Sequence, residues 1–172
     1  LFKVFGENGL MIWQRANGID NSPVVPYTDQ KSISSETTFE QDTTDIKFLN
    51  DTLTTLVSNV AFDLRKQNRV ASTLTVKIRY SNFDTHTVQT KIHLSSSDHV
   101  LIPKAKELFQ KLYDRRMLIR LVGVKLSNLV SGYQQINLFE DTTELINLYQ
   151  ALDCMNKRYG NGAVKRASAI PI

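Results

Sequence analysis

Paired carboxylates are the first side chains to consider, because a close pair can act as general acid and base or bind a metal ion. The nearest pairs in the sequence are Glu140 with Asp141 and Asp42 with Asp45. Both lie where the sequence predicts that a helix begins. Acidic side chains at that position cap free amide groups and stabilise the helix dipole. We therefore interpret both pairs as helix caps and not as an active site.

The remaining reactive side chains do not form a recognisable site either. His86, His93 and His99 lack the spacing of metal ligands, and no glycine-rich phosphate loop is present. Cys154 falls in a predicted helix without a histidine nearby in sequence, which favours a structural role over that of a nucleophile. A single cysteine excludes an internal disulfide framework and favours a reducing, cytoplasmic location. We expect no catalytic residue, cofactor or metal ion in this chain.

Positive charge is concentrated in the middle of the chain. The 172 residues carry 21 Lys and Arg against 17 Asp and Glu, which gives a formal charge of +4. Residues 31–128 hold 15 of these basic and 10 of the acidic side chains, so this segment alone has a charge of +5. Such a segment is compatible with a polyanionic partner, although solvated surfaces of this charge are common. No apolar run approaches the roughly 20 residues that span a bilayer, so we expect no membrane segment.

Hydrophobic periodicity predicts an α+β fold for residues 31–128. Steps of three and four apolar residues predict helices, and strict alternation predicts strands. The predicted order is a strand over 31–39, a helix over 45–67, strands over 69–80 and 87–94, a helix over 98–114 and a strand over 116–126. Two amphipathic helices can cover one face of a four-stranded antiparallel sheet and leave the other face open and polar.

Shorter elements are predicted on both sides of this domain. A short N-terminal helix is expected over 8–17, and the prolines in residues 23–30 favour an extended linker. After a loop over 129–141, an amphipathic helix is expected over 142–156. The apolar face of this C-terminal helix predicts docking on a partner or self-association.

The open face of the predicted sheet gathers cations and short polar side chains. Alternation places Thr75, Lys77 and Arg79 outward on one strand, Lys91 outward on the next and Arg120 on the last. Cations beside hydroxyl donors suit the phosphate backbone of a nucleic acid. The alternative is a solvated face on which lysines prevent aggregation through the sheet edges. Spacing alone does not decide between these interpretations.

Three segments together resemble Y-family translesion DNA polymerases. The segment FGENGLMIWQRANGIDNSPVVP resembles the end of their thumb domain and the tether that follows it. The segment KSISSETTF resembles the opening of their little finger domain, and IRLVGVKLSNL resembles its closing strand. The resemblance implies thumb residues over 1–22, a linker over 23–30, a little finger domain over 31–128 and a tail over 129–172.

The resemblance also implies a function for the sheet. In this family the little finger holds the primer–template duplex by its phosphates, without sequence preference. Positions expected to contact DNA are Lys31, Ser32, Ile33, Ser34, Thr75, Lys77, Arg79, Lys91 and Arg120. The family's palm domain, with its metal-binding carboxylates for a two-metal reaction, is expected to precede Leu1. This chain is therefore expected to be part of a Mg²⁺-dependent DNA polymerase and to lack polymerase activity by itself.

The tail contains a second resemblance. Gln135, Ile136, Asn137, Leu138 and Phe139 resemble the pentapeptide that binds the bacterial sliding clamp. In such a peptide the glutamine forms hydrogen bonds, and the leucine and phenylalanine fill an apolar pocket. The alternative is a loop whose leucine and phenylalanine pack on the domain beside the next helix. For the chain as a whole, the rival hypothesis is a non-enzymatic, ferredoxin-like adaptor that binds protein through its sheet.

Overall fold

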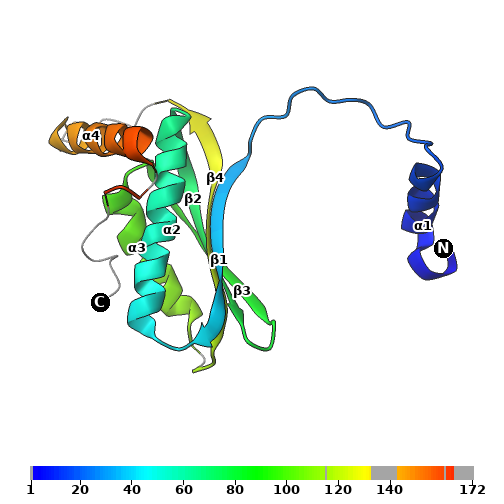
Figure 1. The fold of residues 1–172 in the computed structure, drawn as a ribbon, viewed down its shortest axis with the longest axis horizontal. Coiled ribbons are helices and arrows are strands. Elements are labelled where there is room, and N and C mark those ends of the chain that lie inside the picture. The colour runs from blue at the N-terminus through cyan, green and yellow to red at the C-terminus, as the bar shows by residue number, and fades with distance from the viewer. Residues whose placement is uncertain (1, 115, 133–142, 161, 165–172) are drawn as a thin grey trace.

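A computed structural model describes residues 2–114, 116–132, 143–160 and 162–164 (Figure 1). It confirms the predicted α+β fold, with a four-stranded antiparallel sheet and two helices on one of its faces. The elements in chain order are α1 (Phe2–Ala16), β1 (Ser32–Thr43), α2 (Ile46–Lys66), β2 (Arg69–Tyr80), β3 (Thr85–Ser95), α3 (Asp98–Leu112), β4 (Ile119–Ser131) and α4 (Thr143–Tyr159).

The sheet has the strand order β1-β4-β2-β3, and all neighbouring strands are antiparallel. The last strand in sequence, β4, therefore lies between β1 and β2. It also continues to Ser131, past the predicted domain boundary at residue 128. This order leaves β1 and β3 as the two edge strands, and the β2–β3 hairpin projects from one end of the sheet in Figure 1.

The hydrophobic core lies between the sheet and the pair α2 and α3 (Figure 1). The apolar stripe of α2 includes Leu49, Leu53 and Leu64, and all three side chains are fully buried. Helix α2 begins at Ile46 because Asp45 caps it, its side chain accepting hydrogen bonds from the amide groups of Lys47 and Phe48 at 2.9 and 3.2 Å. On the sheet, the core-facing side chains of β2 are fully or almost fully buried, namely Leu74, Val76, Ile78 and Tyr80.

Helix α1 is longer than the sequence predicted. It runs from Phe2 across a kink at Gly6, whose φ of 57° and ψ of −140° are not helical. The part after the kink, which ends at Ala16, corresponds to the predicted helix over 8–17, and the turn before Gly6 was not predicted. An extended segment then connects α1 to β1 (Figure 1). Several apolar side chains of α1 are exposed, among them Met11 and Trp13. Within the described part of the chain, no helix is long and apolar enough to cross a membrane.

Candidate nucleic-acid interface

The face of the sheet opposite α2 and α3 carries side chains in regular rows. Because neighbouring strands are in register, outward residues from β1, β4, β2 and β3 lie opposite one another. In that strand order, the four rows are Ser32, Ser127, Thr73, Lys91; Ser34, Lys125, Thr75, Gln89; Glu36, Gly123, Lys77, Thr87; and Thr38, Leu121, Arg79, Thr85. No described element packs over these rows in Figure 1. The face is therefore a broad polar surface with four cations in its rows.

Most of the positions predicted from the sequence lie together on this face. Its rows include Ser32 and Ser34 from β1, Thr75, Lys77 and Arg79 from β2, and Lys91 from β3. Lys31 is exposed directly before β1 begins. The structure thus brings predicted residues from three strands, β1, β2 and β3, to one surface.

Ile33 is a predicted position that faces the other way. It pairs with Leu126 on β4, and its side chain is buried in the core beneath α2 and α3. The period of two along a strand requires this, because Ser32 and Ser34 on either side face outward. Only the backbone of Ile33 is available to a ligand on the open face.

Arg120 lies outside the regular rows. The register of β4 against β2 shifts at this point, since Leu121 pairs with Arg79 but Ile119 pairs with Tyr80. This irregularity leaves Arg120 without a partner in the ladder, as an inserted residue in a β-bulge does. Its guanidinium lies 3.7 Å from Asp42 of β1 and 5.0 Å from the centre of the Phe83 ring. Arg120 therefore does not belong to a regular row, and the expectation that it lies on one surface with the other cations stays a prediction.

Lys125 also belongs to the open face, although the sequence pattern did not predict it. It is exposed in the middle of the open face, directly opposite Ser34 on one side and Thr75 on the other. The signal was present, because Val124 and Leu126 on either side of it are apolar. It was obscured by the almost continuous apolar run from Met117 to Val124, in which alternation cannot be recognised.

The cations of the face differ in their partners. The Lys77 ammonium forms an ion pair with Glu36, and the Arg79 Nε donates a hydrogen bond to Thr85 Oγ1 at 2.9 Å. Among the described residues, no carboxylate lies within ion-pair distance of Lys91 or Lys125. Lys91 and Lys125 therefore keep their positive charge without a carboxylate partner among the described residues, and so does Arg79, whose hydrogen bond goes to a neutral hydroxyl.

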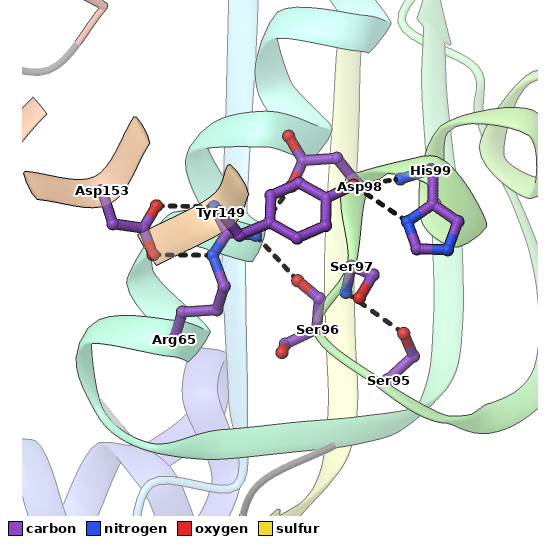
Figure 2. A network of polar contacts seen from close by, with 8 residues as sticks. All are labelled: Arg65, Ser95, Ser96, Ser97, Asp98, His99, Tyr149 and Asp153. Carbon is purple, nitrogen blue, oxygen red and sulfur yellow. Dashed lines mark hydrogen bonds and ion pairs between the residues drawn. The ribbon is translucent and has the colours of Figure 1, made fainter. Parts of the chain in front are cut away.

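A second polar cluster joins α4 to the domain at the C-terminal end of α2 (Figure 2). The guanidinium of Arg65 donates hydrogen bonds to Asp153, to Asp98 and to the carbonyl oxygen of Ser96. Burial opposes the charge on Arg65, but the hydrogen bonds to Asp153 and the charge of Asp98 outweigh it and raise the pKa of Arg65. Its pairing is internal, which favours a structural role for the cluster.

A cavity of about 630 Å³ lies beside this cluster, between α4 and the domain. Its walls include Tyr149 and Ile146 of α4, and Arg69 and Lys157 contribute positive charge. The exposed Cys154 also lines it, without a histidine among the lining residues. In the described ranges, no cluster of His, Cys, Asp and Glu side chains could hold a metal ion.

The predicted clamp-binding residues 135–139 lie outside the described residues. Helix α4 follows them, and it docks through fewer apolar residues than its sequence suggested. Tyr149 is buried, whereas Leu148 and Met155 of the same predicted apolar face are exposed.

The chain is similar in sequence to a known protein family and to two DNA polymerases. Residues 30–138 match the impB/mucB/samB family C-terminal domain. The chain is 38% identical over 168 residues to DNA polymerase IV of Clostridium acetobutylicum, a match covering 95% of this chain and 42% of that protein. It is 32% identical over 184 aligned positions to DNA polymerase IV of Clostridium kluyveri, covering 99% of this chain and 46% of that protein. The chain thus spans less than half the length of these relatives.

The fold is also similar to solved structures. A Y-family DNA polymerase chimera superposes with a TM-score of 0.56 at 23% sequence identity, over 76% of this chain and 38% of that one. At this identity the likeness shows a shared fold and does not transfer individual contacts.

Proposed function

Because this chain belongs to the impB/mucB/samB family through that family's C-terminal domain, we propose that it is the DNA-gripping little finger of a translesion DNA polymerase. The observation that carries the proposal is the uncovered face on which cations and hydroxyls stand in register on four strands. Nucleotide transfer, and the Mg²⁺ that it requires, would belong to the part of the relatives that this chain does not span.

The composition of the face fits phosphate contacts better than base recognition. Lysine and arginine neutralise phosphate charge, and serine and threonine hydroxyls donate hydrogen bonds to phosphate oxygens. The rows contain no aromatic side chain on which a base could stack, which disfavours a sheet that binds single-stranded RNA. A grip of this kind holds a duplex without reading its sequence, as synthesis past a damaged base requires.

A titration of duplex DNA with the 172-residue chain at several KCl concentrations tests the proposal. Neutralising about five phosphates gives a slope of about −4.5 in a plot of log affinity against log salt concentration. Substituting the unpaired Lys125 with glutamine should weaken binding to any sequence and make the slope shallower by about 0.9. Lys111→Gln is the matched control, because Lys111 is exposed on α3, on the covered side of the sheet.

Two results would contradict the DNA-binding proposal. One is binding that is absent or insensitive to salt, which would favour the protein-binding adaptor. The other is an equal loss in Lys125→Gln and Lys111→Gln, which would show that net charge and not the open face determines binding.

We further propose that residues 135–139 tether the protein to a sliding clamp. The support is the sequence of Gln135–Phe139, together with its position directly after a little finger domain. Replacing both Leu138 and Phe139 with alanine should abolish binding to purified clamp and leave duplex binding unchanged. Retained clamp affinity would refute the tether. Self-association through α4 and a cytoplasmic location stay predictions.

A further inference from the structure

One cation of the open face is already neutralised by the protein itself. Lys77 on β2 and Glu36 on β1 form an ion pair, although β4 lies between their strands. Both side chains belong to the row Glu36, Gly123, Lys77, so the pair crosses above Gly123. The Lys77 side chain has 29% of its surface exposed and that of Glu36 52%, so a ligand on this face can reach both.

Gly123 is what allows the two side chains to meet. A Cβ atom at this position would lie 3.0 Å from Glu36 Cβ, 3.3 Å from Glu36 Oε2 and 3.6 Å from Lys77 Cε. Any side chain on β4 here would therefore occupy the path of the ion pair. The backbone of Gly123 has no left-handed φ angle, so the close approach, and not the backbone conformation, accounts for the glycine.

From this geometry we propose that Glu36 is an intramolecular competitor of the DNA phosphate for Lys77. This inference rests on the proposed DNA-binding function and concerns the regulation of its affinity. In the free protein, the Glu36 carboxylate is ion-paired with the ammonium of Lys77. When a duplex lies on the face, a phosphate oxygen replaces the carboxylate, and Glu36 returns to solvent with its charge close to the DNA backbone.

A second carboxylate of β1 also forms an ion pair with a cation. Asp42 of β1 lies 3.7 Å from the guanidinium of Arg120 at the bulge. The carboxylates of β1 thus face two of the cations that the sequence assigned to DNA, while Lys91 and Lys125 have no such partner among the described residues. A weakened grip suits a domain that must let the duplex slide after each nucleotide is added.

Competition makes two quantitative predictions for Glu36→Gln. Duplex affinity at low salt should rise about two- to fivefold, the range that exposed ion pairs support. In the parent protein, Lys77 binds a phosphate only when its ion pair with Glu36 breaks. The counterion released from that phosphate is then offset by the cation that the freed Glu36 carboxylate attracts, so the net release is close to zero. With glutamine at position 36 this offset is absent, and the log–log salt slope should become steeper by about 0.9.

Glu40→Gln is the matched control, because Glu40 is exposed on the same strand and has no cation within ion-pair distance among the described residues. It removes the same charge and should change affinity and slope much less. The same two substitutions made in a Lys77→Gln variant complete the test. Without Lys77, Glu36→Gln should raise duplex affinity no more than Glu40→Gln does.

The outcomes separate this inference from the function on which it rests. Unchanged or lower affinity in Glu36→Gln, or an equal gain in Glu40→Gln, overturns the competition while leaving the DNA-binding proposal intact. A parent chain that shows no salt-dependent duplex binding overturns both. Circular dichroism of each variant confirms that the fold is retained, as the exposure of both glutamates leads us to expect.

Discussion

The guanidinium of Arg65 donates hydrogen bonds to both carboxylate oxygens of Asp153, from Nε to Oδ2 at 2.8 Å and from Nη2 to Oδ1 at 2.9 Å (Figure 2). The two side chains are only 15% and 14% exposed, and they connect α2 to α4 across 88 residues of sequence. Because the remaining nitrogen, Nη1, binds Asp98 and Ser96, the guanidinium is held by α2, α3 and α4 at once. Helix α4 is therefore a built-in part of the domain.

Breaking this pair should loosen α4. We expect Asp153→Asn to lower the free energy of unfolding by about 1.5–3 kcal/mol, because the charged acceptor of two guanidinium hydrogen bonds is lost. Urea denaturation measures the change, and hydrogen exchange of the α4 amides shows whether the helix detaches first. Glu144→Gln is the control, since it removes the same charge from an exposed position of α4. Equal losses in both variants would contradict a specific role for the Arg65 pair.

The hydroxyl of Tyr149 should contribute to the same attachment. It accepts a hydrogen bond from the backbone amide of His99 at 3.0 Å and lies 2.9 Å from Nδ1 of that histidine. Tyr149→Phe leaves the amide in the first turn of α3 without this acceptor, which should cost about 1–3 kcal/mol. Thermal or urea unfolding measures this. Tyr159→Phe should be neutral, because Tyr159 is exposed at the end of α4. If Tyr159→Phe lowered the free energy of unfolding as much as Tyr149→Phe, the hydrogen bond to His99 would not be the cause.

A methyl group on β4 should separate Glu36 from Lys77. In Gly123→Ala the added carbon lies 3.0 Å from Glu36 Cβ, a contact that the side chains alone cannot relieve, so β1 must shift relative to β4. We expect a destabilisation of about 1–3 kcal/mol, as for other overpacked positions. Ser127→Ala, on the same face of the same strand, should have little effect. An unchanged stability of Gly123→Ala would show that the row has more room than its register implies.

Glu107 should titrate at an unusually low pH. Hydrogen bonds from Lys104 and then from Lys111 lower its pKa from 4.5 to about 2. Since the folded-state pKa is the lower one, the stabilisation is complete above the ordinary pKa and is lost as the pH falls toward about 2. Carboxyl NMR titration measures the pKa directly. Lys104→Gln should raise it more than Lys111→Gln, and an ordinary value in the parent chain would refute the interaction.

Patterns within single elements predicted much of the fold. The alternation of residues 69–80 gave β2 its observed bounds, and Asp45 gave the start of α2, because both depend on neighbours in sequence. The ion pair of Glu36 with Lys77 was not predictable in the same way. It depends on β4 entering between β1 and β2 and on its register placing Gly123 between the two charges. Nothing local to residues 36, 77 or 123 encodes that arrangement.

The bulge at Arg120 shows the same limit for the candidate interface. Counting alternate residues along a strand assumes a constant register, and one inserted residue reverses the assignment beyond it. For this reason alternation placed Arg120 outward on the last strand, although the bulge keeps it out of the regular rows. The predicted outward positions of β2 and β3 lie within regular pairing, which runs from Thr73 opposite Lys91 to Arg79 opposite Thr85, and the register shifts only beyond Thr73.

The position of β4 in the sheet has a consequence for how the protein is made. Ribosomes synthesise β1, β2 and β3 first, but β1 has only β4 as a neighbour in the sheet. Until residues 119–127 have left the ribosome, the nascent chain can form the β2–β3 hairpin, while β1 lacks a strand to pair with. Such long-range pairing is slow to form, so we expect a late, abrupt acquisition of protease resistance during translation.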